Sequence, residues 1–508
     1  MEKFYITTSI FYASAKPHIG NSYEVVLTDA LARFKRLQGY DVCFHTGTDE
    51  HGEKVQNYAQ KNNQTPKQYV DKIAAEVQRI DKLLNISYDK FVRTTDEYHK
   101  KTVQKIFSKL YENGDIYKGV YEGLYCTPCE SFFTQSQLIE GKCPDCGREV
   151  HKTKEEAYFL KLSKWNEWLA DYIEKHPNFI TPESRKNEIV NNFIKPGVQD
   201  LCVTRTSFDW GIEVPFDTKH VIYVWIDALA NYITFLGYDP EKENEKFKKY
   251  WPADVHVIGK DILRFHTIYW PVMLKALDLE MPKKIFGHPW VLASDSDKMS
   301  KSKGNVLYAD DLVSEFGTDA IRYYLMHEIP YGHDGNISRL LIIDKINSDL
   351  ANTMGNLVNR TINMCLKYFD GNIYKNNQNE PVDDELINAC TSLNQKISEK
   401  MDELKIAEAL ENIMSIYRLA NKYIDQTEPW KLAKDENKKE RLKTVLYNLI
   451  EAIRVATVYL QAFLPETAEK IFKQINTNEK DISSTLKFNG TYTKVGNPEI
   501  LFARIEKM

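Results

Sequence analysis

A histidine, a glycine and an asparagine stand close together in the loop "AKPHIGN", residues 15–21. Gly20 would let a phosphate approach the backbone closely, and His18 would donate a hydrogen bond to a phosphate oxygen whose charge grows in a transition state. Asn21 carries two amide donors, but it is also a good helix N-cap. The loop on its own therefore permits two interpretations, a phosphate site or a helix cap that contains a histidine.

A second cluster of donors is the segment "SDSDKMSKSKG", residues 294–304. Its three lysines, Lys298, Lys301 and Lys303, alternate with small hydroxyl residues before a glycine. Such a cationic segment suits a triphosphate, although a run of charges is ordinarily a solvated face. The rest of the chain must decide between these interpretations.

Four of the eight cysteines form two C-x-x-C pairs separated by 13 residues. Prolines and a glycine at the pairs favour the tight turns of a zinc knuckle, in which four thiolates hold zinc tetrahedrally. Redox pairs or free thiols are the alternatives, which the spacing and a reducing compartment disfavour. A closed four-cysteine site is structural, because no position stays open for water. The expected ligands are Cys126, Cys129, Cys143 and Cys146, and the scattered Cys43, Cys202, Cys365 and Cys390 are expected in the core.

The elements around the histidine loop are predicted to be a strand, a helix and a second strand. "FYITTSI" (4–10) is β-rich, and "SYEVVLTDALARFKRLQG" (22–39) has apolar residues at helical spacing before its final glycine. "YDVCFHTG" (40–47) then has the composition of another strand. This unit builds doubly wound parallel sheets, which bind ligands beyond the carboxyl ends of their strands. We therefore expect an α/β fold with a nucleotide-binding, Rossmann-like domain.

The character of the chain changes near residue 346, after which long amphipathic segments predict a helical bundle. Asn356 and Arg360 are four residues apart and would share a helix face beside an apolar stripe. An amide and a guanidinium can read base edges, and Trp430, after a proline, could stack on an unpaired base. The alternative for these residues is a surface helix with a tryptophan that only docks it.

Length and composition limit the number of domains and the class of protein. A chain of 508 residues is expected to form two to four domains, and 43% hydrophobic residues are ample for their cores. The net charge of −5 does not indicate a nucleic-acid binder by bulk charge, although a local basic surface could still hold a polyanion. No signal peptide or run of about 18 apolar residues is found, so we expect a soluble, cytoplasmic protein.

"HIG" followed much later by "KMSKS" resembles the paired signature of class I aminoacyl-tRNA synthetases. Along essentially its whole length the chain resembles the methionyl-tRNA synthetase family. The matching segments, in the family's order, are "GTDEHG" (47–52), "CTPC…CPDC" (126–146), "YVWIDAL" (223–229), "IGKDILRFHTIYWP" (258–271), "KMSKSKGN" (298–305) and "NLVNR" (356–360). One departure is Asn21, where the usual signature has a second histidine; an amide can replace one N–H donor, but it cannot be protonated.

The resemblance implies an ATP site in which Asp261 takes a ribose hydroxyl and His288 lies beside the adenosine. The implied ATP-binding residues are His18, Gly20, Asn21, Gly259, Asp261, His288, Lys298 and Lys301, of which His18, Asn21, Lys298 and Lys301 are also the implied catalytic residues. Mg²⁺ would accompany the ATP.

The resemblance also implies a methionine site, which suits a thioether because sulfur packs well against aromatic rings. Asp49 would bind the α-amino group, and Arg205 would hold Asp49 charged and oriented. His266 and Trp270 would share a face if their segment is helical. The implied methionine-binding residues are Ile10, Tyr12, Asp49, Arg205, Trp225, Ala228, Tyr232, Ile262, His266 and Trp270.

By the same resemblance, the anticodon readers are Asn356, Arg360 and Trp430. The expected domains are a catalytic domain in two halves (1–115 and 213–290), an insertion with the zinc knuckle (116–212), a connecting segment with the lysine loop (291–345) and a helical anticodon-binding domain (346–508). The chain ends soon after the bundle, without the C-terminal RNA-binding and dimerising domain of some relatives, so a monomer is expected.

The expected activity joins methionine to tRNA. Methionine and ATP would give methionyl-adenylate, and the methionine would then pass to the 3′ end of initiator or elongator tRNA(Met), releasing AMP. The nearest rival is a class I synthetase for isoleucine, valine, leucine or cysteine, but an insertion of about a hundred residues is too small for an editing domain. More distant rivals are an RNA-binding protein without catalysis and an adenylyltransferase acting on a small metabolite.

Overall fold

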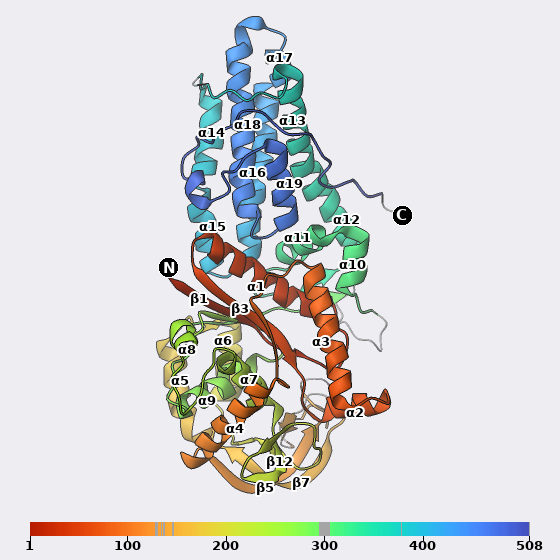
Figure 1. Cartoon of the computed structure of the whole chain (residues 1–508), viewed down its shortest axis with the longest axis vertical. Helices are drawn as coiled ribbons and strands as arrows, with labels where there is room; N and C mark the ends of the chain where they lie inside the picture. The colour runs from red at the N-terminus through yellow and green to blue at the C-terminus, as the bar shows by residue number, and fades with distance from the viewer. Residues whose placement is uncertain are drawn as a thin grey trace. The chain divides into compact units, whose positions relative to one another are not determined.

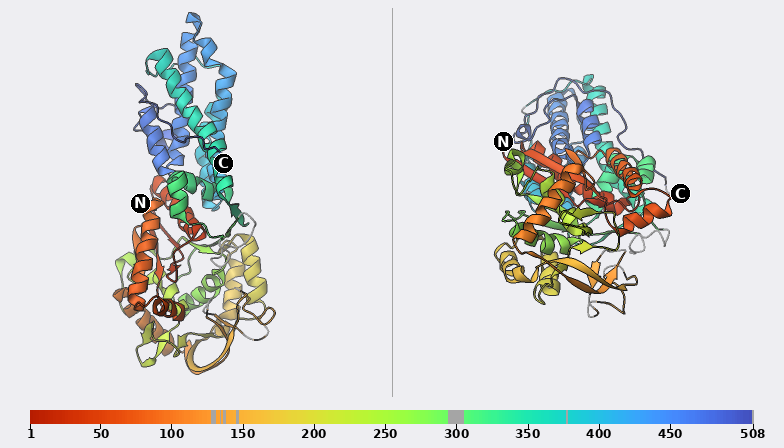
Figure 2. Two further views of the ribbon diagram at one scale, coloured as in Figure 1. Left: turned by 90° about the vertical axis from the view of Figure 1, so that its right-hand side faces the viewer. Right: turned by 60° about the horizontal axis from the view of Figure 1, so that its bottom comes forward.

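The computed structural model describes residues 1–127, 131–133, 135, 138–144, 147–293, 305–376 and 378–506. The chain forms two compact units (Figures 1 and 2). The first comprises residues 1–28, 41–82 and 87–289, and the second comprises residues 29–40, 83–86 and 290–508. The expected α/β fold followed by a helical domain is confirmed.

A parallel sheet forms the centre of the first unit. Its strands run in the order β2-β3-β1-β13-β14-β8, with β4 paired to β3. The order of connection reverses at β1, because the chain passes from β1 to β3 on one side and reaches β13 on the other. Such a switch point is where open α/β sheets bind ligands. The strands are β1 (Lys3–Thr8), β2 (Phe11–Tyr12), β3 (Asp41–Asp49), β4 (Lys90–Arg93), β8 (Ile180–Thr181), β13 (Val255–Gly259) and β14 (Ile285–His288).

The predicted strand–helix–strand unit is confirmed as β1, α1 (Ile19–Leu37) and β3. The apolar residues of α1 recur at helical spacing and are buried, which is why this segment packs as a helix. Gly39 ends it with a positive φ of 88°, which glycine adopts without strain. The helix begins three residues earlier than the sequence suggested, so the histidine loop leads directly into its first turn.

An antiparallel sheet of order β6-β5-β7-β9 and a small sheet of order β10-β12-β11 lie between the halves of the parallel sheet in sequence. These strands are β5 (Ile116–Cys126), β6 (Ser131–Phe133), β7 (His151–Leu160), β9 (Leu201–Cys202), β10 (Thr204–Arg205), β11 (Ile212–Val214) and β12 (Asp217–Ile222). The remaining helices of the unit are α2 (Glu53–Lys61), α3 (Pro66–Leu83), α4 (Glu97–Glu112), η2 (Ser163–Trp165), α5 (Asn166–Lys175), α6 (Glu183–Ile189), η3 (Val190–Ile194), α7 (Val224–Thr234), α8 (Glu245–Tyr250), η4 (Phe265–Tyr269) and α9 (Trp270–Ala276).

The second unit is largely a bundle in which α14, α16 and α18 run side by side (Figure 1). Residues Ile346, Leu350, Met354 and Leu357, the predicted apolar stripe, are all buried. Its elements are β15 (Val291–Ala293), β16 (Gly335–Ile337), α10 (Ala309–Phe316), α11 (Thr318–Glu328), α12 (Arg339–Lys345), η6 (Ile346–Gly355), α13 (Asn356–Phe369), α14 (Pro381–Thr391), α15 (Leu393–Asp402), α16 (Ile406–Thr427), α17 (Pro429–Leu432), η7 (Glu436–Lys438), α18 (Lys439–Leu460), α19 (Pro465–Ile475) and η8 (Ile482–Thr485).

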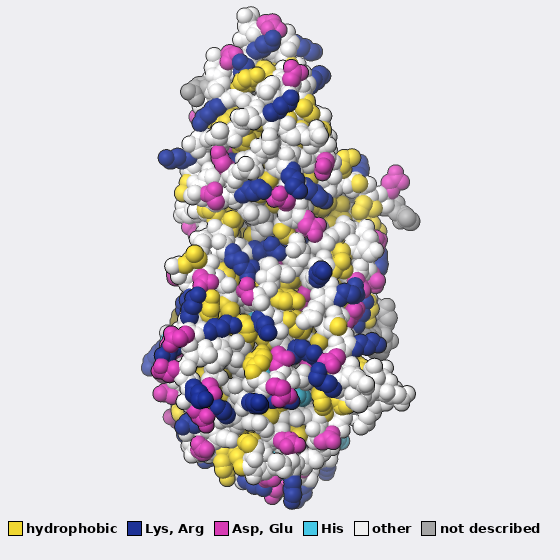
Figure 3. All heavy atoms as spheres, viewed as in Figure 1, with side chains coloured by type: hydrophobic (Ala, Val, Ile, Leu, Met, Phe, Trp, Pro, Cys, Tyr) yellow, Lys and Arg dark blue, Asp and Glu magenta, His cyan; other side chains and the backbone are white. Residues whose placement is uncertain are grey.

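The surface carries charges of both signs. Lysine and arginine side chains are interspersed with aspartate and glutamate over the face drawn in Figure 3, in keeping with the small net charge. Among the described residues, no helix combines the length and the apolar character that crossing a membrane requires.

Candidate active site

The histidine loop lies at the N-terminus of α1, beyond the carboxyl end of β1. His18 precedes the helix, and its Nδ1 accepts a hydrogen bond from the backbone N–H of Gly20 at 3.1 Å. Asn21 was expected as the N-cap, but it is the third helical residue, and its Oδ1 accepts from the backbone N–H of His18 at 3.1 Å. Asn21 is exposed, so its amide supports the cap from inside the first turn while it stays accessible to a ligand.

Glu24, one turn further along α1, ties together the ends of three strands. Its carboxylate accepts hydrogen bonds from the backbone N–H of Ser9 at 2.7 Å and of Gly259 at 3.0 Å. It also lies 2.9 Å from Nε2 of His288. Glu24 was not predicted from the sequence, since a lone glutamate in a helix carries no distinguishing signal.

The residues expected at the ribose lie around this carboxylate. A Cβ at Gly259 would stand 2.6 Å from Oδ1 of Asp261 and 3.7 Å from Nε2 of His288, so a larger residue there would displace the carboxylate of Asp261. Burial disfavours a charged His288, but the hydrogen bond and charge of Glu24 outweigh it and raise the pKa of His288. The predicted set of Gly259, Asp261 and His288 is thus brought together at one edge of the sheet.

The aromatic pocket is organised by hydrogen bonds between buried side chains. Tyr232 Oη lies 2.8 Å from Nε2 of His266, whose Nδ1 lies 3.0 Å from the carbonyl oxygen of Ile262. That carbonyl can only accept, so Nδ1 carries the proton and Nε2 accepts from the tyrosine. Burial lowers the pKa of His266 to about 4, which keeps this imidazole neutral. Burial also raises the pKa of Tyr232, with smaller contributions from the charges of Glu24 and Asp49.

Trp270 is completely buried beside Tyr232, with ring centroids 5.6 Å apart. Its indole N–H donates to Nε2 of His256 at 3.3 Å, and Nδ1 of that histidine lies 2.8 Å from Oγ1 of Thr7. His266 and Trp270 both contact Tyr232, so they share a face as expected, although the segment between them is a π-helix. His256 was missed, because its position on a buried strand looks like ordinary core.

Two further pairs complete the predicted pocket. The ring of Trp225 stacks on Phe265 at a centroid distance of 3.6 Å and an angle of 9°. Ile10, which follows β1, packs in the same buried cluster as Ala228 of α7. Phe265 was not predicted, although its position directly before His266 in the quoted motif could have suggested it.

Asp49 ends β3, and its neighbours hold the following loop in place. β2 pairs Tyr12 with Asp49, which brings the two predicted residues together. A Cβ at Gly47 would stand 2.0 Å from the carbonyl oxygen of Val92, which explains the glycine in "GTDEHG". Glu50 is completely buried and pairs with Arg93 of β4, with an Nε–Oε1 distance of 2.6 Å.

Arg205 was expected to pair with Asp49, and the structure pairs it with Glu155. Its guanidinium Nε lies 2.5 Å from Oε1 of Glu155 on β7, and its Cζ lies 4.0 Å above the ring of Tyr125. β10, which carries the arginine, and β7 lie next to each other, so the nearer carboxylate takes the guanidinium.

The structure describes only some residues of the two cysteine pairs and none of the lysines in the loop at 294–304. Cys126, at the end of β5, and Cys143 are buried in one small cluster with Phe133. Their partners Cys129 and Cys146, and likewise Lys298 and Lys301, lie outside the described residues. One cysteine from each C-x-x-C pair is therefore placed in the same cluster, as a shared metal ion requires.

The three candidate anticodon residues are exposed in the second unit. Asn356 and Arg360 lie on α13, four residues apart and beside a buried stripe. Trp430 follows Pro429 in the short helix α17, and 37% of its surface is exposed, which is unusual for so large an apolar side chain.

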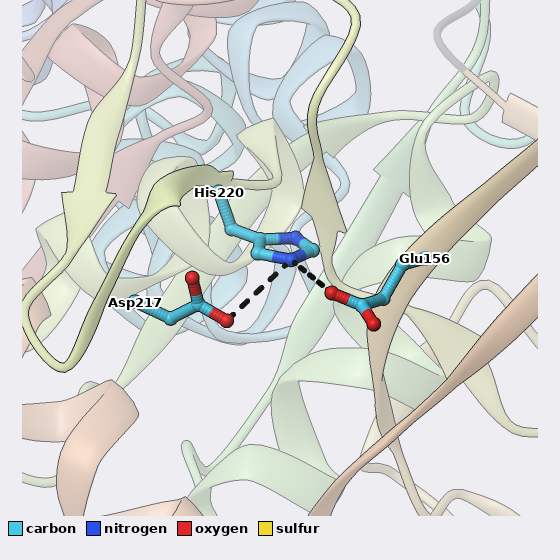
Figure 4. A group of neighbouring side chains, drawn as sticks. All are labelled: Glu156, Asp217 and His220. Atoms are coloured by element: carbon cyan, nitrogen blue, oxygen red, sulfur yellow. Dashed lines mark hydrogen bonds and ion pairs between the residues drawn. The ribbon is translucent and has the colours of Figure 1, made fainter.

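A further group of titratable side chains lies outside this site. Glu156, Asp217 and His220 point toward one another in Figure 4. Lys118 Nζ lies 2.8 Å from both carboxylates, and their hydrogen bonds raise its pKa. Because the ammonium pairs with both carboxylates, this group is an ion-pair network that links β5 and β7 of the larger antiparallel sheet to β12 of the small sheet.

Comparison with known proteins agrees with this geometry. The family profile "tRNA synthetases class I (M)" matches residues 4–155 and 149–362, and the profile "Anticodon binding domain of methionyl tRNA ligase" matches residues 373–508. A nucleotide-binding sheet of this order with its histidine loop therefore defines a class I tRNA synthetase.

The most similar relatives indicate which amino acid this class I synthetase uses. The methionine–tRNA ligases of Clostridium acetobutylicum and Clostridium perfringens are each 60% identical over 99% of this chain and 78% of their own length. The structure of Mycobacterium tuberculosis methionyl-tRNA synthetase in complex with methionyl-adenylate superposes with a TM-score of 0.95 at 39% identity, covering 99% of this chain and 100% of that one. The chain belongs to the methionyl-tRNA synthetase family, and its function is that of a methionine–tRNA ligase.

Proposed function

We propose that the two steps of this ligase take place at the carboxyl edge of the parallel sheet. The methionine carboxylate attacks the α-phosphorus of ATP, releasing pyrophosphate, and the terminal adenosine of tRNA(Met) then attacks the activated carbonyl, releasing AMP. The chemistry asks the protein for positioning and charge stabilisation. The observation that carries the proposal is the convergence of three strand ends at Glu24, whose carboxylate accepts from the N–H groups of Ser9 and Gly259 and lies 2.9 Å from Nε2 of His288.

On the ATP side, His18, the backbone at Gly20, which lets a phosphate approach closely, and Asn21 bind the phosphates at the positive end of α1. Gly259 and Asp261 hold the ribose, with His288 beside the adenosine. Lys298 and Lys301 close over the leaving pyrophosphate. Mg²⁺ would neutralise phosphate charge.

On the methionine side, Asp49 binds the α-ammonium and the aromatic pocket binds the thioether. The pocket walls are Ile10, Tyr12, Trp225, Ala228, Tyr232, Ile262, His266 and Trp270. A neutral His266 and a protonated Tyr232 suit an uncharged thioether, because no ion has to be desolvated by the substrate.

A structural zinc ion would be held by Cys126, Cys129, Cys143 and Cys146. The buried cluster of Cys126 and Cys143, together with thiolate donors spaced for a tetrahedron, supports this ligand set. The ion would supply folding free energy to the tip of the insertion and no catalytic chemistry.

Asn356, Arg360 and Trp430 would read the anticodon of initiator and elongator tRNA(Met). Their exposure on helices of the second unit supports a role in binding a partner. We also propose that the chain acts as a monomer in the cytoplasm, which sedimentation of the purified chain and fractionation of cells would test.

Paired substitutions test the assignment of the two sides. Asp49→Asn should raise the KM for methionine about 10- to 100-fold in ATP–pyrophosphate exchange, because a charge-assisted hydrogen bond is lost. Its KM for ATP should stay nearly unchanged. Asp261→Asn should raise the KM for ATP and leave the KM for methionine nearly unchanged. If both variants changed the same KM, the assignment of Asp49 to methionine and of Asp261 to ATP would be refuted.

A further inference from the structure

A buried carboxylate joins the helix of the aromatic pocket to the loop after Asp49. Asp227 of α7 is fully buried, and its Oδ2 lies 2.6 Å from Nδ1 of His51. Its Oδ1 lies 2.7 Å from Nε2 of His99 on α4, whose Nδ1 lies 2.7 Å from Oγ1 of Thr234. Each oxygen of this carboxylate is thus bonded to an imidazole from a different part of the chain.

The two imidazoles keep the carboxylate ionised in a dry interior. Burial alone would raise the pKa of Asp227, but the charges and hydrogen bonds of His51 and His99 outweigh burial, and the pKa is lowered. An ionised carboxylate can only accept hydrogen bonds, so Nδ1 of His51 and Nε2 of His99 are the donors. Breaking a buried, charged contact of this kind costs much free energy, because it leaves a charge buried without a partner, so the contact holds its two residues firmly in place.

The loop that carries His51 is fixed at a second point. Glu50, between Asp49 and His51, accepts hydrogen bonds from Arg93 at 2.6 and 3.0 Å through its carboxylate. Its backbone oxygen accepts from the indole N–H of Trp210 at 2.6 Å. The chain after Asp49 is therefore held at two points: the side chain of Glu50 binds Arg93 on β4, and the side chain of His51 binds Asp227 on α7.

The helix at the other end of this connection carries three residues of the proposed methionine pocket. Trp225 lies two residues before Asp227, Ala228 follows it directly, and Tyr232 lies five residues after it. A helix is a rigid spacer that advances 1.5 Å per residue, so holding Asp227 also holds these side chains. The bond between His51 and Asp227 consequently sets the separation between Asp49 and the pocket.

We propose that Asp227 is a positioning residue for substrate selection, which holds Asp49 and the aromatic pocket at the separation between the α-ammonium and the thioether of methionine. The inference rests on the proposed function, in which Asp49 binds the α-ammonium. Because Asp227 is fully buried, it acts through His51 and does not touch the substrate.

Inhibition of ATP–pyrophosphate exchange by three methionine analogues tests this role. Methioninol keeps both the amine and the thioether, 4-(methylthio)butan-1-ol lacks the amine, and norleucinol lacks the sulfur. The inhibition constant of 4-(methylthio)butan-1-ol divided by that of methioninol, the amine ratio, measures the contribution of the amine. The inhibition constant of norleucinol divided by that of methioninol, the sulfur ratio, measures the contribution of the sulfur. Asp227→Asn, which keeps the side-chain shape, should reduce the amine ratio about fivefold or more and leave the sulfur ratio within about twofold.

Two further variants separate positioning from general destabilisation. His51→Gln should reduce the amine ratio as Asp227→Asn does, and it replaces that variant if the latter does not fold. His99→Gln keeps an N–H donor on the far side of the carboxylate, so its amine ratio should stay within about twofold of the wild type. An unchanged amine ratio in Asp227→Asn or His51→Gln, or an equal loss in His99→Gln, would overturn the proposal.

The same assay detects a failure of the underlying assignment. If Asp49 binds the amine, Asp49→Asn must abolish most of the amine ratio of the wild type. A wild-type enzyme without amine preference, or an Asp49→Asn variant that retains it, would refute the role of Asp49 rather than that of Asp227.

Discussion

The carboxylate of Glu24 lies 2.9 Å from Nε2 of His288 and so joins helix α1 to the carboxyl end of strand β14. The other ring nitrogen of His288 lies 2.8 Å from the carbonyl oxygen of Pro289, so both nitrogens face acceptors. An imidazolium donates at both positions, which is why the pKa of His288 is raised despite its burial. This contact lies at the edge of the sheet where we propose that ATP binds.

The stabilisation from this contact should depend on pH. A histidine whose pKa is raised in the folded state contributes stability below its unfolded value near 6.5, and this is lost as pH rises through the higher folded value. Glu24→Gln should therefore lower the melting temperature most at or below pH 6.5, and the deficit should shrink at higher pH. Melting curves across this range check it, with His288→Asn as the background in which the pH dependence should vanish. A deficit that is constant with pH in the wild-type background would contradict this explanation.

Lys301 should be the more important lysine of the loop at residues 294–304. Lys301→Ala removes a cation that would stabilise the departing pyrophosphate, so turnover in ATP–pyrophosphate exchange should fall by about 10²- to 10³-fold. Lys303→Ala, which removes the same charge two residues away, should change turnover by less than about threefold. Near-normal exchange in Lys301→Ala would show that this assignment is wrong.

Asn21 should contribute an amide donor to ATP in addition to its bond with the backbone of His18. Asn21→Ala should raise the KM for ATP about 5- to 10-fold through the loss of one hydrogen bond. Asn21→His, which restores an N–H donor, should recover most of that loss. If the KM for ATP and the turnover of Asn21→Ala equal those of the wild type, the residue only supports the helix N-terminus.

Removing one predicted zinc ligand should remove the metal. Cys143→Ser should lower the bound zinc from about one ion per chain to near zero and lower the melting temperature, because a closed thiolate site needs all four ligands. Cys202→Ser is the control, since burial raises the pKa of Cys202 to about 12 and its thiol stays neutral. Metal analysis of both purified variants decides the matter, and zinc retained by Cys143→Ser would exclude the proposed ligand set.

Trp430 should matter for tRNA and not for adenylate formation. Loss of base stacking in Trp430→Ala costs about 1–3 kcal/mol, so the KM for tRNA(Met) should rise about 5- to 150-fold while ATP–pyrophosphate exchange is unaffected. Lys431→Ala alters the next residue, whose ammonium pairs with Glu428, and should have a small effect. Equal aminoacylation kinetics in the two variants would leave Trp430 without a role in recognition.

Local patterns predicted the elements that bear the site, because their causes are local. The apolar spacing of α1 and the β-branched composition of β1 are properties of short segments, and both elements formed as predicted. The pairing of Tyr232 with His266 was also foreseeable in outline, since both belong to quoted motifs of one family.

Local sequence patterns could not predict which side chains pair with one another in the folded chain. Arg205 pairs with Glu155 because β10 packs beside β7, a neighbourhood that only the folded chain creates. Asp227 meets two histidines that precede it by 176 and 128 residues, and no spacing rule reaches across such separations. Glu24 was overlooked for the same reason, because its three partners come from three different strands.

The most direct test of the account is ATP–pyrophosphate exchange by the purified chain with methionine, homocysteine, leucine, isoleucine, valine and cysteine offered separately. We expect strong exchange with methionine, weak exchange with homocysteine and none with the other four amino acids. Exchange driven by a branched-chain amino acid or cysteine would contradict the assigned pocket. No exchange with any of the six would contradict the assignment of "HIGN" as a working phosphate loop.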